Sequence, residues 1–118
     1  MPRAKRGFKA RRRRNKVLKL AEGFTHRRKN TIRRGAEAVD RALRYAYAHR
    51  KARKRDFRQL WINRIGAAAI INGLNYSTLI AKLNDANIQL DRKSLADLAI
   101  FDPTAFSAVV EQAVGARA

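Results

Sequence analysis

The chain has 118 residues, which is enough for one small domain with an extension. Its formal net charge of +19 at pH 7 predicts a nucleic-acid partner first and an anionic membrane surface second. The absence of cysteine excludes disulfides and thiolate metal sites, and no run reaches the ~18 apolar residues of a membrane span.

The charge is divided unevenly along the chain. Residues 1–59 hold 23 Lys and Arg against 4 Asp and Glu, whereas residues 60–118 hold 5 of each kind. We therefore expect a basic arm that penetrates nucleic acid, together with the N-terminal part of a long helix, in residues 1–59. Residues 60–118 should form a compact helical domain. The basic N-terminus lacks the apolar segment of a secretory signal, which predicts a cytoplasmic protein.

The first segment, residues 1–15, is a basic arm in which only Phe8 could serve as an apolar anchor. Its cations are Arg3, Lys5, Arg6, Lys9, Arg11, Arg12, Arg13 and Arg14. Because like charges repel and little can be buried, we expect this arm to be disordered in the free protein, with almost nothing buried before residue 31. A helical pattern begins at about Lys16 and stops at Gly23, and a second basic turn follows at Thr25–Lys29.

The chain is organised around a predicted helix from about Thr31 to about Asn72, rich in strong helix formers. Such a helix is roughly 60 Å long, which exceeds the width of a small domain, so one end must project. Its middle has a cation on every side over about two turns: Arg50, Lys51, Arg53, Lys54, Arg55 and Arg58. The following segment, Leu60–Ile71, is apolar almost all round and should be buried.

Three further helices are predicted at 76–86, 92–100 and 103–114. Each follows a residue suited to N-capping: Asn75, Asp91 or Asp102. Apolar residues five apart flank each cap with the spacing of a hydrophobic staple: Leu74 and Leu79, Leu90 and Leu95, Phe101 and Phe106. The fold class is therefore all-α: an extended basic arm and a long projecting helix that leads into a small four-helix C-terminal domain.

Enzymatic and metal-binding functions find little support. His26 and His49, the only histidines, lie among cations, and neither has a second ligand at helical spacing. We predict no catalytic residue, no metal, no cofactor and no small-molecule substrate. Arginine instead offers a planar fork for phosphate and stacks on bases. Tyr45 and Tyr47 cannot share a helix face, and both stacking on a base and packing on the ribose-phosphate surface remain open for them.

The sequence resembles the bacterial large-subunit ribosomal protein L20 family over nearly its full length. The segments that carry the resemblance are Lys5–Gly7, Lys19–Phe24, Arg50–Ile65, Asn72–Ser77 and Leu90–Ala99. The most specific of them is KRDFRQLWI at Lys54–Ile62 with NGLNYS downstream. Thr25 and His26 depart from the family, which often has a further aromatic residue, Gly or Arg there.

The resemblance implies a cytoplasmic protein of the large ribosomal subunit that binds 23S rRNA, acts early in assembly and contacts neighbouring ribosomal proteins. It leaves open binding to its own messenger, with repression of translation. Charge and resemblance together predict RNA contacts at the cations of the arm and of the long helix's middle, and at a further set of residues. That set is Lys16, Arg27, Arg28, Lys29, Arg33, Arg34, Trp61, Arg64, Arg92 and Lys93. Core packing is the favoured role of Trp61 when it is judged from spacing alone.

Two rival functions remain. A DNA-binding or nucleoid protein needs a basic recognition helix, but helices 76–86 and 92–100 offer only Lys82, Arg92 and Lys93. A membrane-surface protein needs an apolar face opposite the cations, and residues 41–58 lack one. Within the favoured function, we expect the neutral domain to choose the RNA site and the basic half to supply binding strength.

Overall fold

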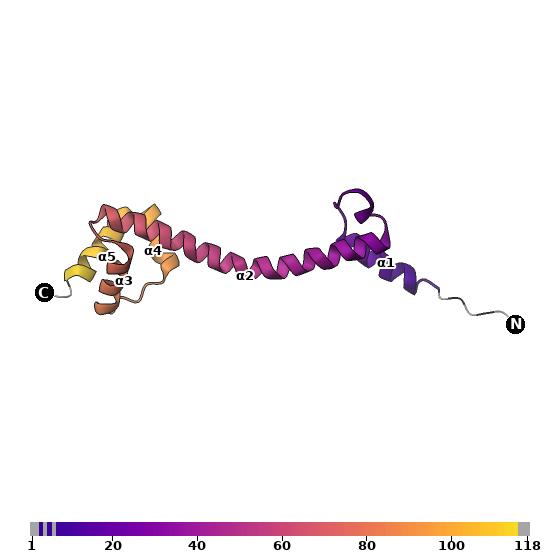
Figure 1. Ribbon diagram of the computed structural model, residues 1–118. Helices are drawn as coiled ribbons and strands as arrows, with labels where there is room; N and C mark the ends of the chain where they lie inside the picture. The colour runs from indigo at the N-terminus through magenta and orange to yellow at the C-terminus, as the bar shows by residue number, and fades with distance from the viewer. Residues whose placement is uncertain (1–2, 4, 6, 116–118) are drawn as a thin grey trace. The chain divides into compact units, whose positions relative to one another are not determined.

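The structure is a computed structural model that describes residue 3, residue 5 and residues 7–115. Within these ranges it contains helices and no strand, which confirms the all-α prediction (Figure 1). The elements are α1 (Lys9–Leu20), the 3-10 helix η1 (His26–Arg28), α2 (Ile32–Ile71), α3 (Tyr76–Asp85), α4 (Arg92–Phe101) and α5 (Pro103–Gly115). None of these helices is long and apolar enough to cross a membrane.

The chain forms two compact units, residues 1–51 and residues 52–118, and each is described by itself. The predicted division after residue 59 followed charge and not packing, and it stays a prediction about function. The long helix was predicted from about Thr31 to about Asn72, and α2 confirms it at Ile32–Ile71.

The prediction of a disordered arm up to residue 15 is wrong for its second half, because α1 already begins at Lys9. Arginine and lysine are strong helix formers, which explains why the basic run adopts this conformation. Among the described residues before residue 31 only Ala21 is buried, in agreement with the expectation that almost nothing is buried there. The predicted stop at Gly23 and the basic turn after it are confirmed by a left-handed Gly23 and by η1.

A close approach of α1 to α2 explains the burial in the first unit. A Cβ atom added to Gly35 of α2 would lie 3.0 Å from the carbonyl oxygen of Arg28 and 3.1 Å from Cδ2 of Leu18. A larger residue would therefore require these neighbouring atoms to shift by a few tenths of an ångström. Ala21, Gly35 and Val39 are the buried residues of this unit among those described.

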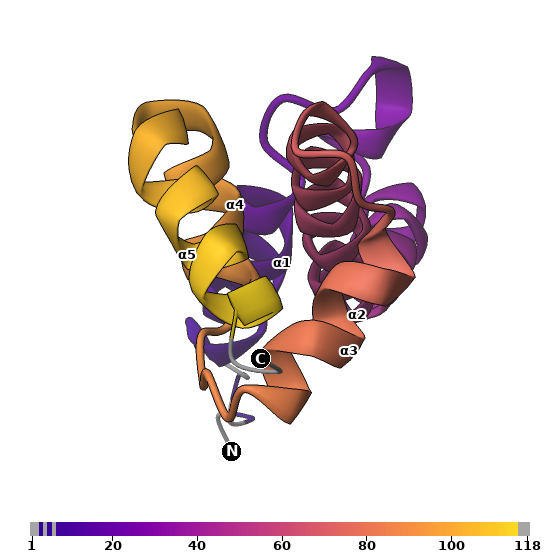
Figure 2. The same ribbon diagram turned by 90° about the vertical axis from the view of Figure 1, so that its left-hand side faces the viewer.

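The second unit has the core of a small four-helix domain, as predicted. Ile65 and Ala69 from the end of α2 form one buried cluster with residues of the other three helices. These are Leu79, Leu83, Leu95, Ala96, Phe106, Val110 and Ala113. Helix α5 packs against both α3 and α4 (Figure 2).

The predicted helix ends of this unit are confirmed in detail. The side chains of Asn75, Asp91 and Asp102 accept hydrogen bonds from the backbone N–H groups three residues ahead, at 2.8, 3.2 and 2.9 Å. Gly73 and Asn87 are left-handed, and the residue after each donates its N–H to the carbonyl five positions back. This Schellman arrangement ends α2 and α3.

Burial of the apolar segment Leu60–Ile71 is only partial, which corrects the prediction. Ile65 and Ala69 are fully buried, but Ile70 and Ile71 are 71% and 87% exposed. The reason is geometric: α3, α4 and α5 cover one side of α2, so the far side stays open. Likewise, Phe101 is 82% exposed, so the predicted apolar contact of Phe101 with Phe106 is absent although the cap at Asp102 is present.

Candidate nucleic-acid interface

The described cations of residues 3–59 all have exposed side chains. They include the predicted contact residues of the arm, of η1 and of α2, namely Arg3, Lys5, Lys9, Arg11, Arg12, Arg13, Arg14, Lys16, Arg27, Arg28, Lys29, Arg33, Arg34, Arg50, Lys51, Arg53, Lys54, Arg55 and Arg58. Arg6 lies outside the described residues. Lys19, Arg41 and Arg44 are equally exposed, although the sequence analysis did not select them. Arg41 and Arg44 could have been found from the same charge run.

Acidic partners for these cations are nearly absent. Among the described cations of residues 3–59, ion pairs are found only with Glu37, from Arg33 at 4.0 Å and from Arg34 at 3.6 Å. Both pairs are highly exposed, and exposed pairs contribute little to stability. The positive charge of α1 and α2 is therefore available to an external polyanion.

Aromatic rings hold several cations in place. Arg12 lies over the ring of Phe8 at 4.2 Å, Lys51 over Tyr47 at 4.8 Å, and Arg53 over Phe57 at 5.7 Å. Such contacts attract a cation to the ring face. They restrict the side chains while leaving the charges exposed, which lowers the ordering cost of binding an anion.

The cations in the middle of α2 lie on one side of the helix, which corrects the expectation of a cation on every side. At about 100° per residue, the six cations between Arg50 and Arg58 cover a little more than half of the circumference. The remaining face carries Ala52, Asp56, Gln59 and Asn63, and Gln59 donates a hydrogen bond to Asn63 at 3.0 Å. One side of this segment is thus cationic and the other is not.

The cations after residue 59 are few and partly fixed. Arg64 and Arg92 are half-buried, and Lys93 is exposed. Nε of Arg92 donates to the hydroxyl of Tyr76 at 2.9 Å, which ties α4 to the start of α3. Trp61 is half-buried and packs against the core, as its spacing predicted, so only part of its ring is free for RNA. The predicted contact residues thus lie in both units.

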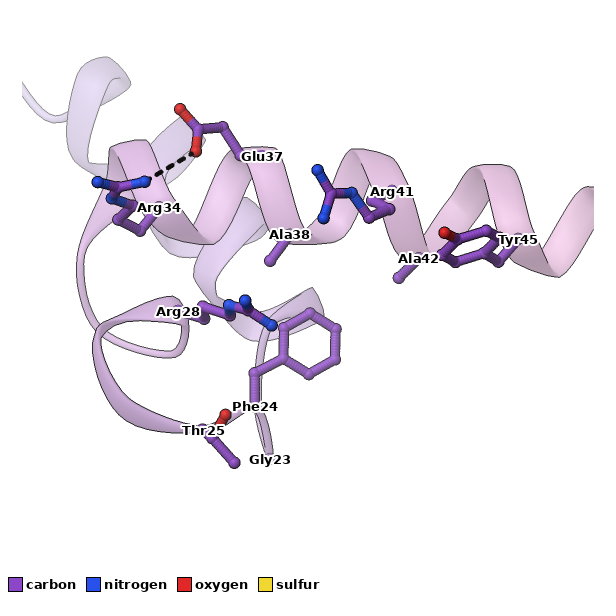
Figure 3. Close-up of a pocket in the computed structure, with 10 residues that line it drawn as sticks. All are labelled: Gly23, Phe24, Thr25, Arg28, Arg34, Glu37, Ala38, Arg41, Ala42 and Tyr45. Atoms are coloured by element: carbon purple, nitrogen blue, oxygen red, sulfur yellow. Dashed lines mark ion pairs between the residues drawn. The ribbon is translucent and has the colours of Figure 1, made fainter.

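A hollow of about 480 Å³ lies between the Gly23–Arg28 segment and the neighbouring face of α2 (Figure 3). Its lining includes three arginines, Arg28, Arg34 and Arg41, and two aromatic rings, Phe24 and Tyr45. The sequence analysis missed this site, because it depends on a loop folding back on α2. The available signal was Phe24 directly after a glycine turn.

Catalytic and metal-binding arrangements are not found in the described residues. No group of three or more His, Asp or Glu side chains there could hold a metal ion. Two carboxyl groups are perturbed. A side-chain hydrogen bond from Ser94, and then its backbone N–H, lower the pKa of Asp91. A side-chain hydrogen bond from Thr104, and then the N–H of Ala105, lower the pKa of Asp102. Both groups are helix caps, so their shifts have a structural cause.

Comparison with known proteins agrees with this picture of a basic surface without a catalytic centre. Residues 3–109 match the family described as Ribosomal protein L20. The chain is 62% identical over 109 residues to the large ribosomal subunit protein bL20 of Geobacter sulfurreducens, which covers 92% of this chain and 93% of the relative. It is 60% identical to the bL20 protein of Citrifermentans bemidjiense over 113 residues, with 96% and 97% covered. The bL20 protein of Syntrophotalea carbinolica is 59% identical, with 96% of each chain covered.

Proposed function

Because this chain belongs to the ribosomal protein L20 family, and is a structural protein of the large ribosomal subunit and not an enzyme, we propose that it binds 23S rRNA directly and promotes early subunit assembly. The observation that carries this proposal is the exposed cationic surface of α1, η1 and α2, which has almost no acidic partners among the described residues. Family membership also places the chain in the cytoplasmic ribosome.

The proposed mechanism follows from phosphate repulsion. A large RNA can fold only if phosphates of different helices are brought together, and cations between them lower the cost. Each phosphate that the protein neutralises releases counterions, which supplies affinity and makes it salt-dependent. The cationic side of α2 at Arg55 and Arg58 then faces RNA, while the side of Asp56 and Gln59 faces elsewhere.

Protein neighbours in the subunit are part of the proposal. Ile71 and Phe101 are 87% and 82% exposed, and large exposed apolar side chains are suited to protein contacts. Binding to its own messenger RNA remains a proposal, which the basic surface supports because it can neutralise the phosphates of any RNA. A DNA-binding role is less well served, because Lys82 and Arg92 on α3 and α4 are half-buried and Arg92 is tied to Tyr76.

The test compares two double variants of the full chain that lower the net charge by the same amount. Arg55→Gln with Arg58→Gln removes two charges from the cationic side of α2, and Gln59→Glu with Asn63→Glu adds two negative charges on the other side. Binding to 23S rRNA is measured over a series of salt concentrations. The first variant should reduce the log–log salt slope by about 0.7–0.9 per lost contact and impair subunit assembly in cells. The second should change both much less.

Competition with duplex DNA and with anionic vesicles separates the rivals. Folded 23S rRNA should displace the protein from both at moderate salt. Equal affinity for duplex DNA and rRNA, or normal subunit profiles in the Arg55→Gln, Arg58→Gln strain, would contradict the proposal.

A further inference from the structure

We propose that the hollow beside α2 is a binding site for one unpaired nucleotide, whose base enters between Phe24 and the α2 face while its phosphate meets the surrounding arginines (Figure 3). This inference rests on the proposed function and deepens it, because it names a local site for a single residue of the bound RNA.

The shape of the site suits a planar ring. Phe24 and Arg28 extend from the loop toward the part of α2 that carries Ala38 and Ala42 (Figure 3). Because both alanine side chains are short and apolar, the surface of α2 leaves space for a ligand at these positions. The volume of about 480 Å³ falls within the roughly 300–1,000 Å³ of small-ligand sites. Tyr45 borders the same space one helical turn beyond Arg41.

The chemistry of the lining matches both halves of a nucleotide. Phe24 and Tyr45 provide faces on which any base can stack, and sequence-specific RNA binding relies on such unstacked bases. Tyr45 is 56% exposed and stacks on His49 with 6.0 Å between the ring centroids, and Phe24 is half-buried, so part of each ring is open to a ligand. Arg28, Arg34 and Arg41 supply guanidinium groups at the rim, and these pair with phosphate.

The single acid of the lining does not cancel this charge. Glu37 pairs with Arg34 at 3.6 Å and with Arg33 at 4.0 Å. Among the described residues, Arg28 and Arg41 have no ion-pair partner. Two guanidinium groups therefore remain available beside an apolar floor. A bare phosphate would leave the rings unused, and an apolar peptide side chain would leave the arginines unused, whereas a nucleotide uses both.

The test uses the full-length protein bound to 23S rRNA and two tyrosines of α2, Tyr45 and Tyr47, which are 56% and 58% exposed. Only Tyr45 lines the hollow, whereas Tyr47 lies under Nζ of Lys51 at 4.8 Å. Tyr45→Leu should weaken rRNA binding by about fivefold or more, which is the loss of one base–aromatic stack. Tyr47→Leu leaves the hollow intact and removes only the ring that restrains Lys51, so its effect should be smaller. Neither should change the salt slope, because neither removes a charge.

A second measurement locates the base directly. Ultraviolet irradiation of the complex, followed by mass spectrometry of the nucleotide–peptide adducts, should place one adduct on Phe24 or Tyr45. The filling variant Ala42→Leu keeps both rings but occupies the floor, and it should abolish that adduct. Ala48→Leu, an exposed position of α2 outside the hollow, should leave the adduct intact. The helical circular dichroism of every variant is compared with that of the parent protein.

The outcomes separate the two proposals. If the parent protein fails to bind 23S rRNA, the proposed function is wrong and the nucleotide site falls with it. If rRNA binds with the expected salt slope but Tyr45→Leu and Tyr47→Leu are equivalent, or no adduct forms at Phe24 or Tyr45, the site is not a nucleotide pocket and the proposed function stands.

Discussion

Helix α1 and the helices of the C-terminal unit reach the same secondary structure by different routes. Helices α3 and α4 each begin with a side-chain cap at Asn75 or Asp91 and bury residues in a shared core. Helix α1 has no side-chain cap at Phe8 and buries none of its residues. Its contact with α2 depends on the room that Gly35 leaves.

This difference shows that the stability and the positive charge of the protein come from different parts of the chain. Residues 60–115 are held by apolar burial, and Arg64 and Arg92 among their few cations are half-buried. The basic part is held by helix propensity and by one close backbone contact, so its many cations are supported weakly. We infer that the basic part is stabilised mainly when phosphate binds, because the bound anion then removes the repulsion among its side chains.

The largest expected effect lies in the core of the C-terminal unit. Phe106 is fully buried, and Phe106→Ala should destabilise this unit by about 3–5 kcal/mol through lost burial and a cavity. The matched control is Phe101→Ala, since Phe101 is 82% exposed and should cost less than about 0.5 kcal/mol. Urea unfolding followed by circular dichroism measures both. Similar costs would show that the core assignment is wrong.

Replacing either of two glycines of α2 with alanine should change stability by an intermediate amount, with opposite signs in the two units. A Cβ atom at Gly66 would have Tyr76 Cβ at 3.9 Å as its nearest neighbour, so Gly66→Ala should stabilise the protein by up to about 1 kcal/mol through helix propensity. A Cβ atom at Gly35 would lie 3.0 Å from the backbone oxygen of Arg28 and 3.1 Å from Cδ2 of Leu18, so Gly35→Ala should loosen the packing of η1 and α1 on α2 instead.

Hydrogen exchange at the amides of α1 and α2 distinguishes these outcomes. Faster exchange of α1 is expected only in Gly35→Ala. Protection of α1 that is unchanged in this variant would argue against the close α1–α2 contact.

The smallest effect concerns pH. The carboxylates of Asp91 and Asp102 accept hydrogen bonds in the folded state that lower each pKa below the unfolded value of about 3.9. A lowered folded pKa gives stability that is present above about pH 4 and lost as pH falls through the folded pKa. The melting temperature of the C-terminal unit should therefore fall in acid. Asp91→Asn should weaken this dependence, and an identical acid profile in the variant would contradict the capping role.

Local rules explain which features the sequence predicted well. The caps at Asn75, Asp91 and Asp102 are decided by residues within one turn, so their positions were predicted correctly. The exposure of Ile71 was missed, because it depends on which side of α2 the other helices cover.

The basic part was predicted less well for a related reason. Charge repulsion argued for disorder before residue 16, but intrinsic helix propensity prevails from Lys9 onward. Phe24 and Tyr45 line the same hollow although they lie far apart along the chain. No periodic pattern in the sequence predicts that they share a site. The list of RNA contacts rests on charge and resemblance and remains a prediction.

The central claim, that the neutral C-terminal part chooses the RNA site while the basic part supplies strength, is tested most directly by two charge-matched double variants of the full chain. Arg13→Gln with Arg14→Gln alters α1, and Arg92→Gln with Lys93→Gln alters α4. Affinity for a 23S rRNA fragment that the protein binds and for a scrambled RNA is measured at several salt concentrations.

The α1 variant should weaken binding to both RNAs equally, because phosphate contacts carry no sequence information directly. The α4 variant should reduce the ratio of the two affinities, because rigidly held cations read the shape of the RNA. If the ratio instead falls in the α1 variant and is unchanged in the α4 variant, the basic part determines the preference for the RNA site and the claim is wrong.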